Sequence, residues 1–114
     1  MRLLIADSDP LILRSLKILF ASYSDIEIVG LIADSADAVE MCIVENPDVV
    51  LLDYRLDIVS TTRQIKAQCP NAQIIISTFF GITPEVQKAM NAGAKGYIVK
   101  ADGVLGVIEK ICEI

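Results

Sequence analysis

The chain has 114 residues, of which 54% are hydrophobic, and a net charge of −5. This length suits one domain with a sizeable core, and the lack of a basic stripe argues against DNA binding by this chain alone. Histidine is absent, which excludes catalytic triads and metal sites built on it, and no apolar run is long enough to span a membrane. We therefore expect a cytoplasmic protein without a membrane-embedded part.

Short apolar runs bounded by turn residues predict strands, and apolar residues every three to four positions predict helices. Asp9-Pro10 and Thr83-Pro84 each combine a capping residue with a first-turn proline, and Gly93 marks a helix end. In chain order we predict a strand at 2–6, a helix at 10–21, a strand at 27–33, a helix at 35–46, a strand at 49–53, an irregular segment at 54–61, a helix at 61–68, a strand at 73–78, a helix at 84–92, a strand at 96–99 and a helix from about 102.

Helical spacing also predicts which side chains face the core. We expect the following side chains to point inward: Ile12, Leu16, Leu19, Phe20, Tyr23, Val39, Cys42, Ile43, Val104, Val107, Ile108 and Ile111. Cys42, Cys69 and Cys112 are far apart and odd in number, so they support neither a disulfide framework nor a zinc site. We expect these cysteines to be small, buried apolar side chains in a reducing compartment.

The alternation of strands and helices predicts an α/β fold with a parallel sheet, right-handed crossovers and helices on both faces. The run from Val49 to Leu52 is apolar at every position, which is typical of a central strand buried on both faces. No linker, repeat or low-complexity tract divides the chain. We therefore expect one domain over residues 1–114.

Four polar residues stand at the ends of predicted strands: Asp7, Asp53, Thr78 and Lys100. Because ligands bind at the carboxyl ends of strands in open α/β sheets, we expect these side chains to share one crevice. Two close carboxylates repel unless a cation joins them, and Mg²⁺ prefers carboxylate and phosphate oxygens. A lysine can neutralise a phosphate, and a carboxylate can itself be the nucleophile that forms an acyl phosphate. The pattern predicts a phosphoryl-acceptor site.

Three motifs at these strand ends, residues 5–11, 46–53 and 92–100, together resemble the receiver (CheY-like) domain of two-component response regulators over nearly the whole chain. Residues 26–30, and Lys100 followed by Ala101, most resemble receivers of LuxR-type (NarL/FixJ) transcription regulators. The resemblance implies a flavodoxin-like (βα)5 three-layer sandwich with a five-stranded parallel sheet in the order 2-1-3-4-5. A receiver of this kind would be a phosphorylated signalling protein and not an enzyme.

The resemblance also implies a role for each site residue. Asp53 would accept a phosphoryl group from a partner sensor histidine kinase, and Mg²⁺ would be the cofactor. The implied metal ligands are Asp7, Asp53, the backbone carbonyl of Arg55 and, weakly or through water, Ser8; the implied phosphate-binding and switch residues are Lys100, Thr78 and Tyr97. The switch would alter the face formed by residues 84–92, residues 96–99 and the last helix, where Leu105 and Cys112 are surplus apolar residues suited to a homodimer. A DNA-binding output domain would normally follow such a receiver.

Three departures from the family pattern leave other functions open. Ser8 stands where most receivers have a second acid, the loop at Leu56 to Val59 is short, and Phe79 replaces a small residue beside the site. These features favour, as an alternative, a pseudo-receiver that binds partners without phosphorylation. A small haloacid-dehalogenase-like phosphatase is a third possibility, because Asp7-Ser8-Asp9 follows a strand, although the chain is short for that family.

Overall fold

Five strands form one parallel sheet in the order β2-β1-β3-β4-β5, as the resemblance implies. The computed structural model describes the backbone of residues 1–114 and every side chain except that of Asp102. The elements are β1 (Arg2–Ala6), α1 (Pro10–Phe20), β2 (Glu27–Ile32), α2 (Ser35–Glu45), β3 (Val49–Asp53), α3 (Ile58–Gln68), β4 (Gln73–Thr78), α4 (Pro84–Asn91), β5 (Gly96–Val99), the short 3-10 helix η1 (Lys100–Asp102) and α5 (Gly103–Cys112).

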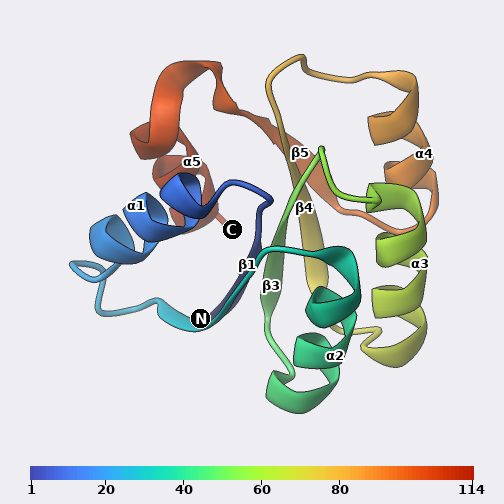
Figure 1. Ribbon diagram of the computed structural model, residues 1–114, viewed down its shortest axis with the longest axis horizontal. Coiled ribbons are helices and arrows are strands. Elements are labelled where there is room, and N and C mark those ends of the chain that lie inside the picture. The colour runs from blue at the N-terminus through green and yellow to red at the C-terminus, as the bar shows by residue number, and fades with distance from the viewer.

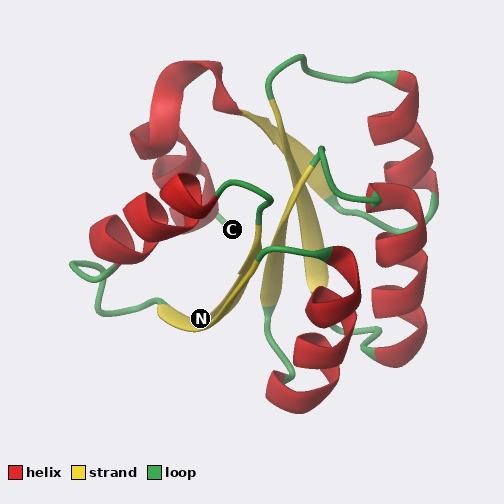
Figure 2. Ribbon diagram, in the orientation of Figure 1, coloured by secondary structure: helices red, strands yellow, loops and turns green.

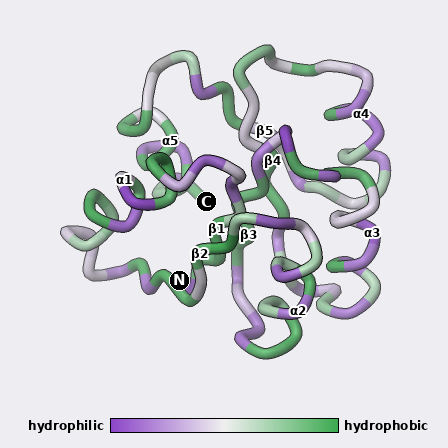
Figure 3. Tube along the Cα trace, in the orientation of Figure 1, coloured by the Kyte–Doolittle hydropathy of each residue, from purple (hydrophilic) through white to green (hydrophobic). Residues whose placement is uncertain are grey.

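The helices cover the sheet on both faces and make a three-layer sandwich (Figures 1 and 2). Helices α1 and α5 lie on one face, and α2, α3 and α4 lie on the other. Each face has its own hydrophobic core, one containing Phe20 and Ile108 and the other Cys42 and Ile65. Every residue of the central strand β3 is buried, and Figure 3 shows hydrophobic residues gathered along the middle of the sheet. The prediction of a strand covered on both faces is confirmed.

Side-chain caps fix the beginnings of three helices. The carboxylate of Asp9 accepts a hydrogen bond from the backbone N–H of Leu11, and Pro10 opens α1. Asp34 caps α2, and Thr83 caps α4 ahead of Pro84 in the same way. These contacts satisfy N–H groups that have no partner within the helix, so both predicted cap-and-proline starts are confirmed.

The structure corrects the predicted start of the third helix. α3 begins at Ile58 rather than at Thr61, so the segment predicted as irregular already includes its first turn. The side chains of Ile58, Thr62 and Ile65 are buried at intervals of three to four residues, which continues the helical period upstream of Thr61. Strand β2 ends at Ile32, one residue earlier than predicted.

Three side chains predicted to be buried are exposed. Ile43 is 54% exposed because α2 turns Ala38 and Cys42 toward the sheet and Ile43 lies beside that line. Tyr23 follows the end of α1 and packs edge-to-face on Phe20 with its outer side in solvent. Cys112, in the last turn of α5, is exposed, whereas Cys42 and Cys69 are buried as predicted. Within the described part of the chain, no helix has both the length and the apolar character needed to cross a membrane.

Candidate functional site

The register of the sheet brings Asp7 and Asp53 to the same level. Ala6, the last residue of β1, pairs with Leu52 of the neighbouring strand β3, and each is followed directly by an aspartate. Both carboxylates are buried at the carboxyl edge of the sheet, and Asp53 has no exposed surface. Two buried carboxylates at one edge need positive charge nearby, because each would otherwise oppose ionisation of the other.

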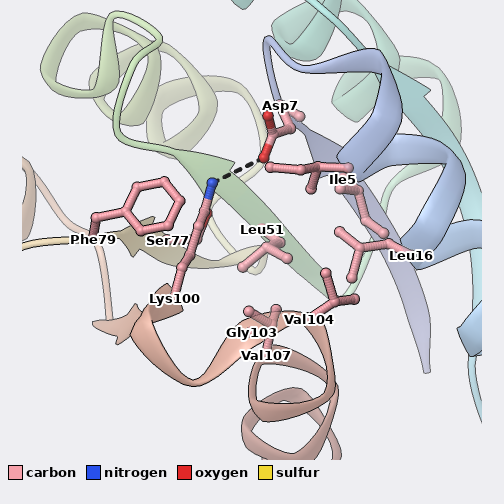
Figure 4. Close-up of a pocket in the computed structure, with 12 residues that line it drawn as sticks. Ile5, Asp7, Leu16, Leu51, Ser77, Phe79, Lys100, Gly103, Val104 and Val107 are labelled. Carbon is pink, nitrogen blue, oxygen red and sulfur yellow. Dashed lines mark hydrogen bonds and ion pairs between the residues drawn. The ribbon is translucent and has the colours of Figure 1, made fainter.

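Lys100 supplies part of that charge from the end of β5. Strand β4 lies between β3 and β5, so the long lysine side chain reaches across the end of β4 (Figure 4). Its Nζ atom donates to Asp7 Oδ2 at 3.0 Å and also contacts Asp53 Oδ1. The lysine is itself buried, with 7% of its side chain exposed. A buried ammonium is stable here because two carboxylates accept its hydrogen bonds.

Arg55 supplies the second cation. Its Nε atom donates to Asp53 Oδ2 at 2.9 Å, and its Nη2 atom donates to Asp7 Oδ1 at 3.0 Å. The hydrogen bond to Asp53, with the negative charges of Asp53 and Asp7, raises the pKa of the guanidinium above its ordinary value. We call Asp7, Asp53, Arg55 and Lys100 the four-charge cluster. Its two anions and two cations balance.

The residues after β1 add further contacts to the cluster. The backbone N–H of Asp9 donates to Asp7 Oδ1 at 2.9 Å. The hydroxyl of Ser8 donates to Asp53 Oδ2 at 3.4 Å, which is a weak contact. Ser8 therefore touches the site without adding a negative charge to it.

Aromatic rings stand beside the lysine. The Nζ atom of Lys100 lies 5.3 Å from the centre of the Phe79 ring and 6.0 Å from that of Tyr54. Tyr54 packs edge-to-face on both Phe79 and Phe80. Ring faces attract cations, so this aromatic group favours the ammonium position. The ring expected beside the site at Phe79 is present.

An apolar cavity of about 130 Å³ adjoins the cluster on the α1–α5 face. Asp7 and Lys100 border it, together with Ser77 and Phe79 (Figure 4). The remaining lining is mostly aliphatic and includes Leu16 and Val104.

Two predicted site residues make no hydrogen bond to the cluster among the described side chains. Thr78 is buried at the end of β4, and its hydroxyl oxygen accepts a hydrogen bond from the backbone N–H of Phe80. Tyr97, on the edge strand β5, is 40% exposed. The structure therefore brings Asp7, Asp53 and Lys100 together, with Ser8 at their margin. It does not join Thr78 or Tyr97 to them by a hydrogen bond among the described side chains.

Sequence reasoning missed the side chain of Arg55. The resemblance implied only a role for its backbone carbonyl, whereas its guanidinium is the part that bridges Asp7 and Asp53. The charge balance of the predicted site could have indicated it. Asp7 and Asp53 were predicted to be neighbours with Lys100 as their one cation. An arginine two residues after Asp53 is within reach of both carboxylates.

The arrangement does not fit a divalent metal ion. All four oxygens of Asp7 and Asp53 already accept hydrogen bonds from Arg55 or Lys100. No group of three or more His, Cys, Asp or Glu residues suited to a metal occurs among the described side chains. Mg²⁺ favours several charged oxygens around it, and Ser8 adds none. The predicted Mg²⁺ site stays a prediction.

Comparison with known proteins identifies a family and its relatives. Residues 3–109 match the model of the response regulator receiver domain. The chain is 32% identical over 103 residues to an uncharacterized transcriptional regulatory protein, YhcZ, of Bacillus subtilis, covering 88% of this chain and 48% of the relative. It is 27% identical over 113 residues to the response regulator protein VraR of Staphylococcus saprophyticus, covering 96% of this chain and 54% of the relative. The chain thus spans about half the length of these relatives.

A solved structure shares the fold. The crystal structure of a two-component response regulator of the LuxR family from Aurantimonas superposes with a TM-score of 0.85 at 25% identity, covering 98% of this chain and 82% of that chain.

Proposed function

This chain belongs to the response regulator receiver domain family, and on that premise we propose that it accepts a phosphoryl group on Asp53 from a partner sensor histidine kinase. The observation that carries the proposal is the pairing of Asp53 with Asp7 and Lys100 at the carboxyl edge of the sheet. A carboxylate held there, next to a lysine that can neutralise a phosphoryl group, is suited to nucleophilic attack on phosphorus.

The proposed step is a phosphoryl transfer between two nucleophiles. An oxygen of Asp53 attacks the phosphorus of a phosphohistidine, a P–O bond forms, and the P–N bond breaks. The electron pair of the broken bond stays on the imidazole nitrogen, and the product is an acyl phosphate on Asp53. Lys100 would hold the added negative charge, because its ammonium already contacts both carboxylates.

Access to Asp53 requires a movement of Arg55. Asp53 has no exposed surface, whereas 35% of the Arg55 side chain is exposed above it. Rotation of this side chain toward solvent would open the carboxylate to a donor. A long surface arginine has many rotamers, so the movement needs no change in the fold.

We further propose that phosphorylation acts through Thr78 and Tyr97 on the face formed by α4, β5 and α5. Leu105 on α5 is 61% exposed and Tyr97 on β5 is 40% exposed, which suits a homodimer contact on that face. DNA binding would belong to an output domain of a longer protein, a proposal supported by the match to about half of a transcriptional regulatory protein and of a response regulator protein. Residues 1–114 would then be the receiver domain of that protein.

Acetyl phosphate in the presence of Mg²⁺ tests the proposal without the kinase. Its phosphoryl group would pass to Asp53 with loss of acetate, and intact-protein mass spectrometry would show one added phosphoryl group. Asp53→Asn should abolish the addition because an amide is a poor nucleophile. The matched control is Asp25→Asn, an exposed carboxylate far from the cluster, which should react as the unchanged chain does. Equal phosphorylation of Asp53→Asn would reject the proposal.

One observation favours a second function, a pseudo-receiver that binds partners without phosphorylation. Both carboxylates are fully engaged by Arg55 and Lys100, and Asp53 is sealed from solvent. A chain with this function would stay unmodified in acetyl phosphate, and Asp53→Asn would leave its partner binding unchanged. The family match and the regulatory relatives give no support to the phosphatase alternative.

A further inference from the structure

We infer that the guanidinium of Arg55 is the built-in cation of this site, and that it competes with divalent metal ions for the space between Asp7 and Asp53. The proposed function assigns the carboxylate pair a phosphoryl-transfer role, and the inference deepens that role by naming what neutralises the pair. Four side-chain contacts and the charge balance of the cluster carry the inference.

The guanidinium of Arg55 bridges the two carboxylates. Arg55 uses two different nitrogens, Nε on Asp53 and Nη2 on Asp7, at 2.9 and 3.0 Å. A planar guanidinium has its donors in a fixed fork, so it can bridge two carboxylates that face each other. All four carboxylate oxygens of Asp7 and Asp53 accept hydrogen bonds from Arg55 or Lys100, so a divalent ion shared by the two aspartates would have to displace one of these cations. Arg55 and a metal ion therefore compete for the same two carboxylates.

The charge of the cluster also opposes metal binding. Two carboxylates balance Arg55 and Lys100, so the net charge is zero before any ion binds. A cation entering this neutral cluster gains little attraction unless Arg55 leaves, and leaving costs two charge-assisted hydrogen bonds. Ser8 lies 3.4 Å from Asp53 Oδ2 and offers a neutral hydroxyl where a carboxylate would attract the ion. We therefore expect the unchanged chain to bind Mg²⁺ weakly.

The competition between Arg55 and a metal ion is reversible. The Arg55 side chain is one-third exposed, whereas those of Asp7 and Lys100 are buried. Arg55 is thus the one member of the cluster that can turn outward without breaking the core. Removing its guanidinium should leave a net charge of −1 and two carboxylates partly free to bind a metal ion.

Isothermal titration calorimetry with Mg²⁺ tests the inference on the full chain. Arg55→Ala should bind Mg²⁺ about tenfold or more tightly than the unchanged chain, because one positive charge and one competitor are gone. The matched control is Arg63→Ala, which removes the same charge from the exposed side of α3 and should leave the affinity unchanged. Ser8→Asp added to Arg55→Ala should tighten binding further, since it adds a third carboxylate next to Asp53.

Thermal unfolding with and without millimolar Mg²⁺ gives a second readout. Ligand binding to the folded state raises the Tm, so the Tm of Arg55→Ala should rise with Mg²⁺ and that of the unchanged chain should not. Equal affinity in Arg55→Ala and the unchanged chain, or equal gains in both arginine variants, would overturn the inference. Neither readout involves phosphorylation. If acetyl phosphate fails to modify Asp53 while the affinities change as expected, the proposed function falls and the inference stands.

Discussion

At the scale of single residues, the site is a buried arrangement of charges in which each member depends on the others. Lys100 and the two aspartates it contacts are almost wholly buried, so none of the three can rely on water for solvation. Burying charges is costly, and the cost is offset only while every charge keeps its partner. The cluster should therefore contribute to folding as well as to chemistry.

Removing Lys100 tests this dependence. Lys100→Met keeps most of the volume but leaves two buried carboxylates with Arg55 alone, so the free energy of unfolding should fall by roughly 3–5 kcal/mol. Urea denaturation followed by circular dichroism measures the change. Lys110→Met, on the exposed side of α5, removes the same charge and should change the stability by less than about 0.5 kcal/mol. Similar losses in both variants would show that the cluster contributes little to folding.

At the scale of elements, the packing of β2 against β1 depends on a glycine. The register between the two strands shifts between Leu3 and Leu4, next to the point where Leu4 pairs with Gly30. A Cβ atom at Gly30 would lie 2.7 Å from Leu4 Cδ1 and 3.0 Å from Met41 Cγ. Leu4 is fully buried, so it has little room to move.

Gly30→Ala should therefore destabilise the fold. The expected loss is about 1–3 kcal/mol, the usual range for overpacking a core, measured as a shift in the urea midpoint. Gly96→Ala is the control, because no atom lies within 4 Å of a Cβ built there and its backbone is not left-handed. That variant should be as stable as the unchanged chain or slightly more so. If Gly30→Ala matched it, the close contact with Leu4 would carry no energetic weight.

Element types and the residues that end the strands could be predicted from the sequence, and the details of side-chain direction could not. Asp7, Asp53 and Lys100 meet because parallel strands bring their carboxyl ends to one edge, which follows from the strand pattern alone. Arg55 was missed because its role depends on a side-chain rotamer, not on backbone position. Ile43 was misplaced because one helical step, about 100°, separates it from the buried Cys42. α3 begins earlier than predicted because the buried side chain of Ile58 continues the helical period upstream of Thr61.

At the scale of the whole molecule, the core on the α2–α3–α4 face buries two of the three cysteines. Cys42 lies in the core beneath α2, where burial raises the pKa of its thiol from 9.0 to about 12. Cys69 is also buried, and Cys112 is exposed at the end of α5. Because the thiolate is the reactive form, burial and a raised pKa both slow alkylation.

Alkylation by iodoacetamide at pH 8 should modify Cys112 quickly and leave Cys42 and Cys69 protected until urea unfolds the chain. Mass spectrometry of digested peptides identifies the modified thiols. Rapid labelling of all three thiols in the folded chain would contradict the packing of the core that holds Cys42 and Cys69.

The raised pKa of Cys42 has a further consequence with a defined sign: its contribution to stability is complete below pH 9.0 and is lost as pH rises toward about 12, because the unfolded thiol ionises first.

The most direct test of the account is to find which atom receives the phosphoryl group. After reaction with acetyl phosphate, borohydride reduces an acyl phosphate on an aspartate to the alcohol of homoserine, and peptide sequencing by mass spectrometry locates that residue. We predict homoserine at position 53 and intact aspartate at position 7. Homoserine at position 7, or at neither position after exhaustive reaction, would contradict the claim that Asp53 is the phosphoryl acceptor of this fold.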